Sequence, residues 1–343
     1  MKLQDYDFYL PEELIASKPP KKRGSSRLLV LDQHIEDKMI EDFEQYLNPG
    51  DILVLNDTKV LKARLNARKK TGGAVEVLIE RLLTENYALA QTRSNRKIQK
   101  GETIKVENSS IEIKFIDREG QLFKIEFSEE PRKVLDLHGK IPLPPYIKRN
   151  VDNQDEERYQ TVYAKEDKKN SVAAPTAGLH FTKAQLSKMK KKGIDINYIT
   201  LDIGLGTFGP IRNENFKNHL MHSERVSIDE ETANKINIAL DTDSKIIAIG
   251  TTVLRCLESV YKKFGKLKQY EGETDLFIYP GYKLGVVDTL LTNFHLPKSS
   301  LFLLVCAFGG TQNLKLAYNH AVDLNYKFFS YGDAMLINRL DGK

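Results

Sequence analysis

Residues 111–127 read IEIKFIDREGQLFKIEF, and they show how the chain is divided. Apolar and polar residues alternate on both sides of a turn that contains Gly120, which is the pattern of two paired strands. The runs VEVLIERLL (75–83) and YALAQT (87–92) have the same strand-like composition. Because apolar spacing typical of helices is almost absent around them, the sequence predicts a small all-β domain, a barrel or strongly curled sheet, over residues 65–149.

The rest of the chain alternates strand-like and helix-like segments. KIIAIG (245–250) has the composition of a strand, and residues 251–265 after it have the pattern of a helix. Further helices are expected over Pro11–Ala16 and after Thr182, which can form a capping box with Gln185. The predicted fold class is therefore a mixed α/β main domain with an inserted small all-β barrel domain, the main domain comprising residues 1–64 plus 150–343.

The composition narrows the class of protein. Of the 343 residues, 41% are hydrophobic and 29% are charged, which suits a globular chain with a substantial core. No apolar run is long enough to span a membrane, and the first residues do not resemble a signal peptide. The two cysteines, Cys256 and Cys306, lie far apart, which favours a reducing cytoplasm and argues against a thiolate metal site. We expect a cytoplasmic protein.

The cations are clustered, although the net charge is only +5. Such clusters attract phosphate backbones, but a lysine-rich solvated surface would have the same composition. Three groups stand out: Lys18, Lys21, Lys22, Arg23 and Arg27; Lys62, Arg64, Arg68, Lys69 and Lys70; and Arg93, Arg96, Lys97 and Lys100.

The segment GLGTFG (204–209) matches the spacing of a dinucleotide-binding loop. A strand is expected before it, over Ile196–Ile203, but Pro210 and the residues after it do not have the pattern of a helix. A dinucleotide site is therefore disfavoured. A glycine-rich turn, or a loop that brings the backbone close to another ligand, remains open.

Three histidines occur in segments rich in polar or small residues. They are His180 in SVAAPTAGLHF, His222 in HLMHSE and His295 in TNFHLPKSSL. Histidine titrates near neutrality and suits acid and base roles, although a structural histidine is the plain alternative. A metal site at His219 and His222 is disfavoured, because no third ligand follows at a recognisable spacing. We expect no metal.

The segment GTTVLRCLES (250–259) predicts a helix that begins after Gly250. The free N–H groups of a helix start can bind a carboxylate or phosphate, with Arg255 on the same side. The alternative is that Arg255 forms a surface ion pair with Glu258.

Taken together, these stretches resemble the bacterial S-adenosylmethionine:tRNA ribosyltransferase-isomerase family. The resemblance runs from Leu10 to Ile337 and rests on SRLLVLD, GDILVLNDTKVLKARL, LPPYI, SVAAPTAGLHFT, LGTF, HLMHSE, IYPGY, VVDTLLTNFHLPKS and FFSYGDAMLI. It implies an enzyme of queuosine synthesis, a transferase and isomerase with an inserted β-barrel. The family moves the ribosyl part of S-adenosylmethionine onto 7-aminomethyl-7-deazaguanine at the tRNA wobble position, and the products are epoxyqueuosine, adenine and methionine.

The resemblance also implies partners and residues. The partners would be a tRNA with a GUN anticodon and S-adenosylmethionine as co-substrate, with no prosthetic group and with a monomer or weak dimer as the active form. Acid and base candidates are His180, His222, His295, Asp288 and Glu224. Candidates for S-adenosylmethionine binding are Gly178, Gly206, Thr207, Phe208, Gly250, Thr251, Thr252 and Arg255. Candidates for tRNA binding are Arg64, Arg68, Lys69, Arg93 and Arg96. Gly209 departs from the family, which usually has arginine there, so a substrate contact at that position is in doubt.

Two other functions fit parts of the pattern. A methyltransferase that uses S-adenosylmethionine on RNA would leave S-adenosylhomocysteine rather than adenine. A non-catalytic RNA-binding protein would use the β domain and would not need its histidines.

Overall fold

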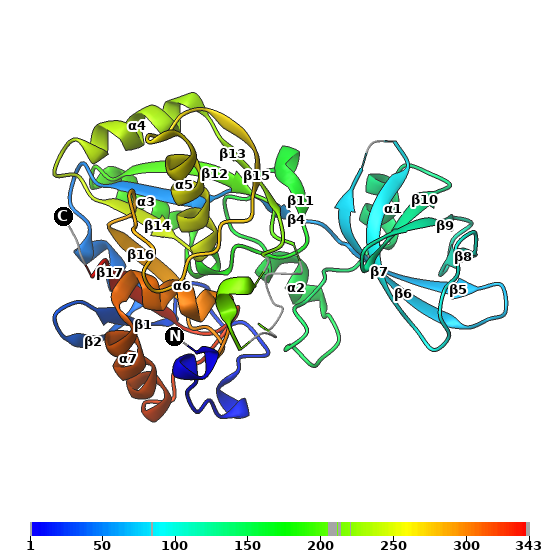
Figure 1. Ribbon diagram of the computed structural model, residues 1–343, viewed down its shortest axis with the longest axis horizontal. Helices are drawn as coiled ribbons and strands as arrows, with labels where there is room; N and C mark the ends of the chain where they lie inside the picture. Colours follow the sequence, from blue (N-terminus) through cyan, green and yellow to red (C-terminus); the bar gives the residue numbers. More distant parts are fainter. Residues whose placement is uncertain (1, 84, 205–210, 212–213, 220, 341–343) are drawn as a thin grey trace.

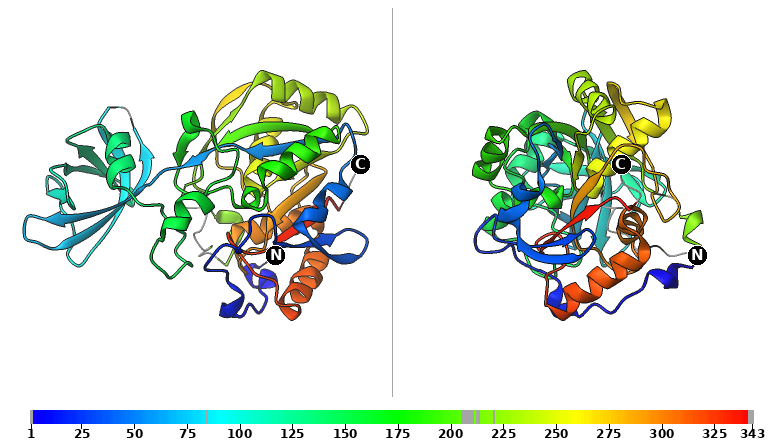
Figure 2. Two further views of the ribbon diagram at one scale, coloured as in Figure 1. Left: turned by 180° about the vertical axis from the view of Figure 1, so that it is seen from behind. Right: turned by 90° about the vertical axis from the view of Figure 1, so that its left-hand side faces the viewer.

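The computed structural model describes residues 2–83, 85–204, 211, 214–219 and 221–340. Figure 1 shows a large α/β domain with a smaller barrel standing to one side of it. The same separation is visible from behind in Figure 2, where the barrel projects from the main body. This architecture confirms the predicted fold class.

The inserted domain is a closed barrel of six antiparallel strands, in the order β10-β7-β6-β5-β8-β9. The predicted hairpin is formed by β9 and β10. Alternate residues such as Val77, Ile113 and Phe115 are buried, so the barrel is filled by its own side chains. Its elements are β5 (Arg64–Lys69), β6 (Ala74–Leu82), β7 (Tyr87–Ser94), β8 (Thr103–Val106), β9 (Glu112–Glu119), β10 (Leu122–Phe127) and the following helix α1 (Pro131–His138).

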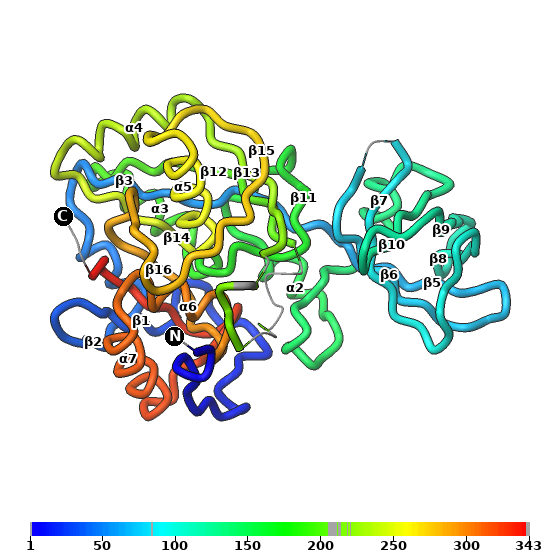
Figure 3. The backbone as a smooth tube through the Cα atoms, in the orientation of Figure 1, coloured from blue at the N-terminus to red at the C-terminus, as the bar shows by residue number. Residues whose placement is uncertain are grey.

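The chain enters and leaves the barrel at adjacent points, as the tube in Figure 3 shows. There Arg64 and Lys140 form an antiparallel bridge, with N–H···O distances of 3.1 and 2.8 Å. The domain boundaries at 65 and 149 stay predictions. Barrel and main domain also touch through Arg81 and Glu273, whose charged atoms are 3.1 Å apart.

The main domain contains a nine-stranded sheet in the order β15-β13-β12-β3-β14-β16-β17-β1-β2. The four central strands β12, β3, β14 and β16 are parallel, and β3 and β14 are buried along their whole length, as expected for strands covered on both faces. The strands are β1 (Arg27–Leu31), β2 (Ile35–Met39), β3 (Ile52–Asn56), β12 (Asp195–Leu201), β13 (Glu224–Ile228), β14 (Ile246–Ile249), β15 (Tyr270–Thr274), β16 (Thr289–Asn293) and β17 (Ala334–Asn338), beside a small sheet of β4 (Lys59–Val60) and β11 (Lys169–Ser171).

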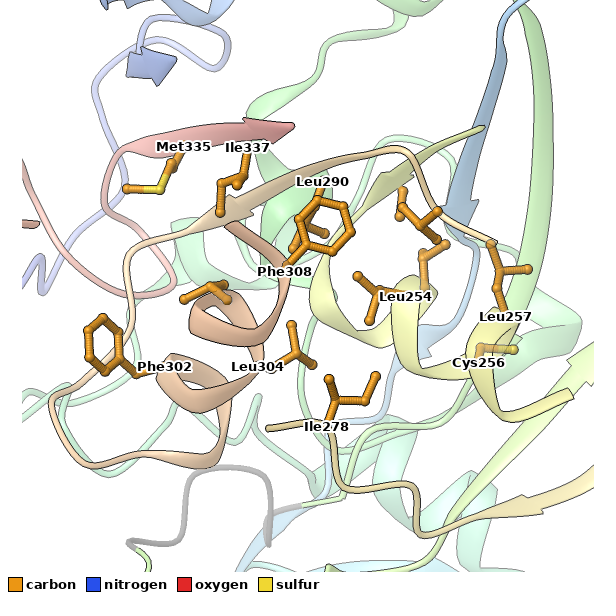
Figure 4. Packing of buried hydrophobic residues seen from close by; sticks show 14 of the residues in the cluster. Leu254, Cys256, Leu257, Ile278, Leu290, Phe302, Leu304, Phe308, Met335 and Ile337 are labelled. Carbon is orange, nitrogen blue, oxygen red and sulfur yellow. The ribbon is translucent and has the colours of Figure 1, made fainter. Parts of the chain in front are cut away.

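Helices cover both faces of the large sheet. Figure 4 shows part of the apolar core on one face, in which Leu254 and Leu257 of one helix belong to the same cluster as Leu290, Phe308 and Ile337. That face is covered by α4 (Glu230–Leu240), α5 (Thr251–Phe264), α6 (Ser300–Gly309) and α7 (Thr311–Asp323). The other face carries α3 (Lys183–Lys191) and the 3-10 helices η3 (Ile40–Tyr46) and η5 (Thr176–His180). The remaining elements are α2 (Asn153–Arg158), η1 (Leu3–Tyr6), η2 (Glu12–Leu14), η4 (Glu166–Lys168) and η7 (Phe216–Asn218).

Two predictions of helix starts had different outcomes. The capping box at Thr182 is present, since its side chain accepts a hydrogen bond from Gln185 N. The helix expected over Pro11–Ala16 is wrong, because only the 3-10 turn η2 forms. Six residues are too few to hold a helix alone, and Ile15 instead pairs with Phe328 in a parallel bridge.

Among the described residues, no single helix is long and apolar enough to cross a membrane; one pair, α6 with α7, would pass such a test by length and composition, but only together and bent by 115°.

Candidate active site

The polar groups of interest gather at one edge of the sheet. The central strands end at Asn56 in β3, at Ile249 in β14 and at Asn293 in β16, and all three point the same way. In open α/β sheets ligands bind outside the carboxyl ends of parallel strands. The helix η5 lies against this edge, because Thr176 Oγ1 donates to Asn293 Oδ1 at 2.8 Å. We call this region the carboxyl edge.

His180 lies at the carboxyl edge, and both of its ring nitrogens are occupied. Nδ1 is 2.9 Å from Ser26 Oγ, and Nε2 is 3.1 Å from Asn293 Nδ2. The orientation of the Asn293 amide is fixed, because Nδ2 also donates to the carbonyl of Phe329 at 3.0 Å. His180 Nε2 must therefore accept a hydrogen bond, and the ring proton sits on Nδ1 and is donated to Ser26.

The environment keeps His180 neutral. Burial, assisted by the charge of Arg23, lowers the pKa of His180 to about 4. A neutral imidazole with Nε2 already engaged can hold Ser26 in place, but it can accept a substrate proton only after Asn293 has moved. The arrangement thus favours a positioning role for His180 over a direct role as base.

Asn293, Ser26 and Phe329 were missed by the sequence prediction. Phe329 has φ +72°, a left-handed conformation that is costly for a bulky residue. Its N–H donates to Phe294 O at 3.1 Å and its carbonyl accepts from Asn293, so the surrounding structure holds the strained peptide. Backbone strain of this kind clusters at functional sites. The only available signal was that these residues stand in polar or glycine-containing segments next to buried strands.

His295 follows the same strand but belongs to another environment. Its ring Nε2 is 3.1 Å from Thr292 Oγ1, and its backbone N–H donates to Tyr318 OH at 3.0 Å. Thr292 and Asn293 are consecutive in β16 and so face opposite sides of the sheet. His295 is thereby held on the α7 side, and the structure does not bring it together with His180.

The buried state of His295 predicts a pH effect on stability. Burial lowers the pKa of His295 to about 3, below the usual 6.5 of an unfolded chain. The unfolded state therefore binds the proton first, so the stabilisation is complete above pH 6.5 and is lost as the pH falls towards 3. Between pH 7.5 and 5, wild type should lose about 2 kcal/mol more than His295→Gln in urea unfolding. Equal losses in both proteins would contradict this assignment.

Glu224 and Arg255 form a buried ion pair, each less than 4% exposed at the side chain. Arg255 Nε also donates to Leu276 O at 3.0 Å, and Glu224 Oε1 accepts from Gly204 N at 3.4 Å. The alternative of a surface pair between Arg255 and Glu258 is wrong, because α5 is buried on almost every side. Glu258 instead accepts three backbone N–H groups, from Gly285, Val286 and Val287.

Asp288 lies at the opposite edge of the sheet from His180, whereas His222 lies at the same edge but beside another strand. Asp288 precedes β16, so it is at the opposite end of that strand, where its Oδ2 accepts from Ile246 N at 2.9 Å. His222 is exposed, just before β13, and because β13 is antiparallel to β12 it stands at the carboxyl edge. His219 is the residue that caps the end of η7, and His222 lies outside any helix or strand.

The start of α5 offers an anion site. Gly250 has φ +100° and no described side chain caps the helix. The N–H groups of Val253 and Leu254 donate to Gly250 O, which leaves those of Thr251 and Thr252 for a ligand. Thr252 Oγ1 is buried and has no hydrogen-bond partner among the residues that the structure describes. Gly178 has a different role, because a Cβ there would lie 2.0 Å from Tyr163 OH, so glycine is required for packing. Gly206, Thr207, Phe208 and Gly209 lie outside the described residues.

Asp202 is a carboxylate that the sequence prediction overlooked. It follows β12 directly, at the carboxyl edge, and its Oδ1 accepts from Thr58 Oγ1 at 2.8 Å. Burial raises the pKa of Asp202, and the hydrogen bond from Thr58 only partly opposes this. A carboxyl group with a raised pKa beside a ligand-binding edge suits proton transfer.

The five predicted tRNA-binding cations are not equivalent. Three of them contact glutamates: Arg64 with Glu76 at 3.4 Å, Arg68 with Glu107 at 2.9 Å, and Lys69 with Glu102 at 2.9 Å. Arg93 and Arg96 are exposed, and neither has a salt bridge within the described part of the chain. In the same part, no group of three or more His, Cys, Asp or Glu side chains is placed to hold a metal ion.

Comparisons with known proteins point to one family. The model of a family described as "Queuosine biosynthesis protein" matches residues 3–337. The S-adenosylmethionine:tRNA ribosyltransferase-isomerase of Nitrosospira multiformis is 46% identical over 358 residues, covering 100% of both chains. The protein of the same name from Aromatoleum aromaticum is 48% identical over 339 residues, covering 98% of this chain and 97% of its own.

A solved structure is similar as well. The crystal structure of S-adenosylmethionine tRNA ribosyltransferase from Thermotoga maritima matches with a TM-score of 0.56 and 33% identity, covering 97% of this chain and 99% of that one. A family match over nearly the whole chain, joined by relatives of equal length, shows that this chain belongs to the queuosine biosynthesis protein family.

Proposed function

We propose that this chain is an S-adenosylmethionine:tRNA ribosyltransferase-isomerase. It transfers and isomerises the ribosyl group of S-adenosylmethionine onto 7-aminomethyl-7-deazaguanine at the wobble position of a tRNA with a GUN anticodon. Epoxyqueuosine forms, and adenine and methionine are released. The observation that carries the proposal is the 46% identity with an enzyme of that name over the full length of both chains. The reaction takes place where tRNA is modified, in the cytoplasm, and a monomer or weak dimer carries it out.

The methionine carboxylate of the co-substrate binds at the start of α5. The N–H groups after Gly250 and the positive end of the helix dipole attract an anion. Thr251 and Thr252 flank this position, and the buried hydroxyl of Thr252 can donate to the carboxylate. Arg255 supports the site from behind through Glu224, and it does not bind the carboxylate itself.

The proton transfers use groups at the same edge. The sulfonium acidifies the C5′ proton, the amine of the modified base must lose a proton to attack, and adenine leaves more readily when protonated. Asp202, with its raised pKa, is suited to deliver a proton to adenine. His222, exposed at the carboxyl edge, is suited to accept one. His180 positions Ser26, while His295 and Asp288 stabilise the fold around β16.

The product test is direct. The purified protein is incubated with S-adenosylmethionine and a tRNA carrying 7-aminomethyl-7-deazaguanine, and free adenine and the digested nucleosides are quantified. Adenine released in step with epoxyqueuosine supports the proposal. S-adenosylhomocysteine would identify an RNA methyltransferase, and bound tRNA without any turnover would identify a non-catalytic RNA-binding protein.

Thr252→Val tests the carboxylate site. The variant keeps the shape of the side chain but removes the hydroxyl donor, and a hydrogen bond to a charged group contributes about 1.5–3 kcal/mol. We expect the Kd for S-adenosylmethionine, measured by calorimetry, to rise about 10-fold or more. Thr252→Ser keeps the hydroxyl and should bind almost as tightly as wild type. Equal affinity in the valine variant would place the carboxylate elsewhere.

A further inference from the structure

The N-terminal segment of residues 17–24 is tied down beside His180 by three arginines. Arg149 Nε donates to Ser17 O at 2.8 Å, and Arg158 Nη2 donates to Pro20 O at 2.8 Å. Arg23, from within the segment, donates to Leu179 O at 3.2 Å, next to His180. Surface loops are usually mobile. Hydrogen bonds from three guanidinium groups to backbone carbonyls therefore indicate that this segment is held in one position. We call residues 17–24 the basic rim.

The basic rim borders a cavity of about 570 Å³. Lys18, Lys21 and Arg158 line it, whereas the only carboxylate among its described lining residues is Asp152, which is engaged as the N-cap of α2. Lys18 and Lys21 are exposed, and neither forms a salt bridge with another described residue. The cavity therefore presents positive charge that the rest of the described chain does not neutralise.

A second, much smaller cavity of about 10 Å³ lies next to the first. The two share Pro19, Pro20 and Arg158, and the smaller one is also lined by Ser26 and His180. The residues of the basic rim that border the larger cavity thus also border the surroundings of His180.

We propose that Lys18 and Lys21 bind RNA phosphates next to the nucleotide that is presented to the carboxyl edge. The inference rests on the proposed function and adds a binding site outside the barrel. A strand of RNA fits this cavity because it supplies several phosphates in sequence. The methionine carboxylate of the co-substrate is not the expected ligand here, because we place it at the start of α5. The arginine contacts order the segment before binding, so RNA binding does not carry the entropic cost of ordering it.

The basic cluster of the N-terminal sequence thereby gains a specific role. Phosphate contacts position an RNA but carry no base specificity, so the rim should set affinity and placement rather than the choice of base. Each neutralised phosphate of a single strand adds about 0.7 to the slope of log K against log salt. Loss of two contacts should reduce that slope by about 1.4.

The experiment compares full-length wild type with Lys18→Glu/Lys21→Glu. The probe is a fluorescent RNA hairpin with the sequence of a GUN anticodon stem-loop, and Kd is measured by anisotropy over a salt series. The matched control is Lys190→Glu/Lys191→Glu, which reverses two exposed lysines at the end of α3, near the opposite edge of the sheet. Lys18→Arg/Lys21→Arg keeps the charge.

We expect the rim variant to bind at least about 10-fold more weakly with a reduced slope, while the arginine variant and the control stay close to wild type. The affinity for S-adenosylmethionine should not change. If the control variant bound RNA as weakly as the rim variant, the loss of affinity would come from net charge alone and the proposal would be overturned. Unchanged RNA affinity in the rim variant would overturn it as well. A weakened affinity for S-adenosylmethionine alone would assign the cavity to the co-substrate and overturn the proposal too. RNA binding is measured without turnover, so a wild type that binds RNA through the rim but releases no adenine would sink only the proposed function.

Discussion

Replacing Asn293 with aspartate should raise the pKa of His180 by about two pH units from its value of about 4, and lower kcat by about 100-fold. The amide of Asn293 donates to His180 Nε2 and to the carbonyl of Phe329. An aspartate in its place cannot donate to either group. The aspartate would instead accept a hydrogen bond from His180 Nε2 and so favour a proton on that nitrogen. At low pH both ring nitrogens are then protonated and the ring is an imidazolium, whereas at higher pH the neutral ring carries its proton on Nε2 instead of Nδ1.

The change would reach the substrate through two routes. A reversed tautomer would accept from Ser26 rather than donate to it, so the hydroxyl would lose its present direction. The carbonyl of Phe329 would face a carboxylate, which removes one of the hydrogen bonds that hold the strained peptide and leaves those that join it to Gly332 N and Phe294 O. A wrong tautomer alone is known to slow enzymes severely while leaving geometry intact.

The measurement combines NMR with kinetics. Ring ¹³C and ¹⁵N shifts of labelled His180 report its pKa and which nitrogen carries the proton, and kcat and KM are measured across pH 5–9. Thr176→Val is the matched control, because it removes a neighbour of Asn293 Oδ1 without touching the donor side. A ring that keeps its proton on Nδ1 and its low pKa in the aspartate variant would contradict the positioning role.

The fold was largely predictable because its signals are local. The hairpin of residues 111–127 is predicted by the alternation of apolar and polar residues. The helix after Gly250 is predicted by its apolar residues at helical spacing and by the glycine before it. The prediction of a helix over Pro11–Ala16 was wrong because local propensity cannot reveal that Ile15 will pair with Phe328, at the other end of the chain. Periodicity is visible in a short segment, whereas tertiary pairing decides what that segment becomes.

The site was less predictable, because the sequence does not reveal on which face of the sheet a side chain lies until the neighbouring strands and helices are known. Two histidines in similar loops received the same role, yet His180 reaches the carboxyl edge while His295 bonds to Thr292 on the other side. Asn293 and Asp202 carry no signature in sequence, since an asparagine or aspartate at the end of a strand is an ordinary turn residue. Their importance comes only from the partners that the fold supplies.

Arg255→Met should lower the free energy of unfolding by about 3–5 kcal/mol, even without ligand. Methionine fills the space, but Glu224 would stay buried and lose the guanidinium of Arg255, and removing one partner of a buried pair costs more than the pair contributes. The carboxylate also accepts from Gly204 N, at the point where the chain leaves β12. The variant should therefore also weaken S-adenosylmethionine binding, as a secondary effect of a displaced strand end.

The second variant needed is Arg255→Met/Glu224→Gln, which removes both charges. Because a neutral glutamine tolerates burial, the double variant should be more stable than Arg255→Met alone, and the double-mutant cycle should give a coupling of about 2 kcal/mol or more. Urea unfolding followed by circular dichroism measures this, and calorimetry measures the affinity for S-adenosylmethionine. If Arg255 instead bound the methionine carboxylate, the free protein would lose about 1 kcal/mol or less, while affinity would fall in both variants alike. A large loss of stability that glutamine at 224 relieves would establish that the arginine holds the edge of the sheet on which the site is built.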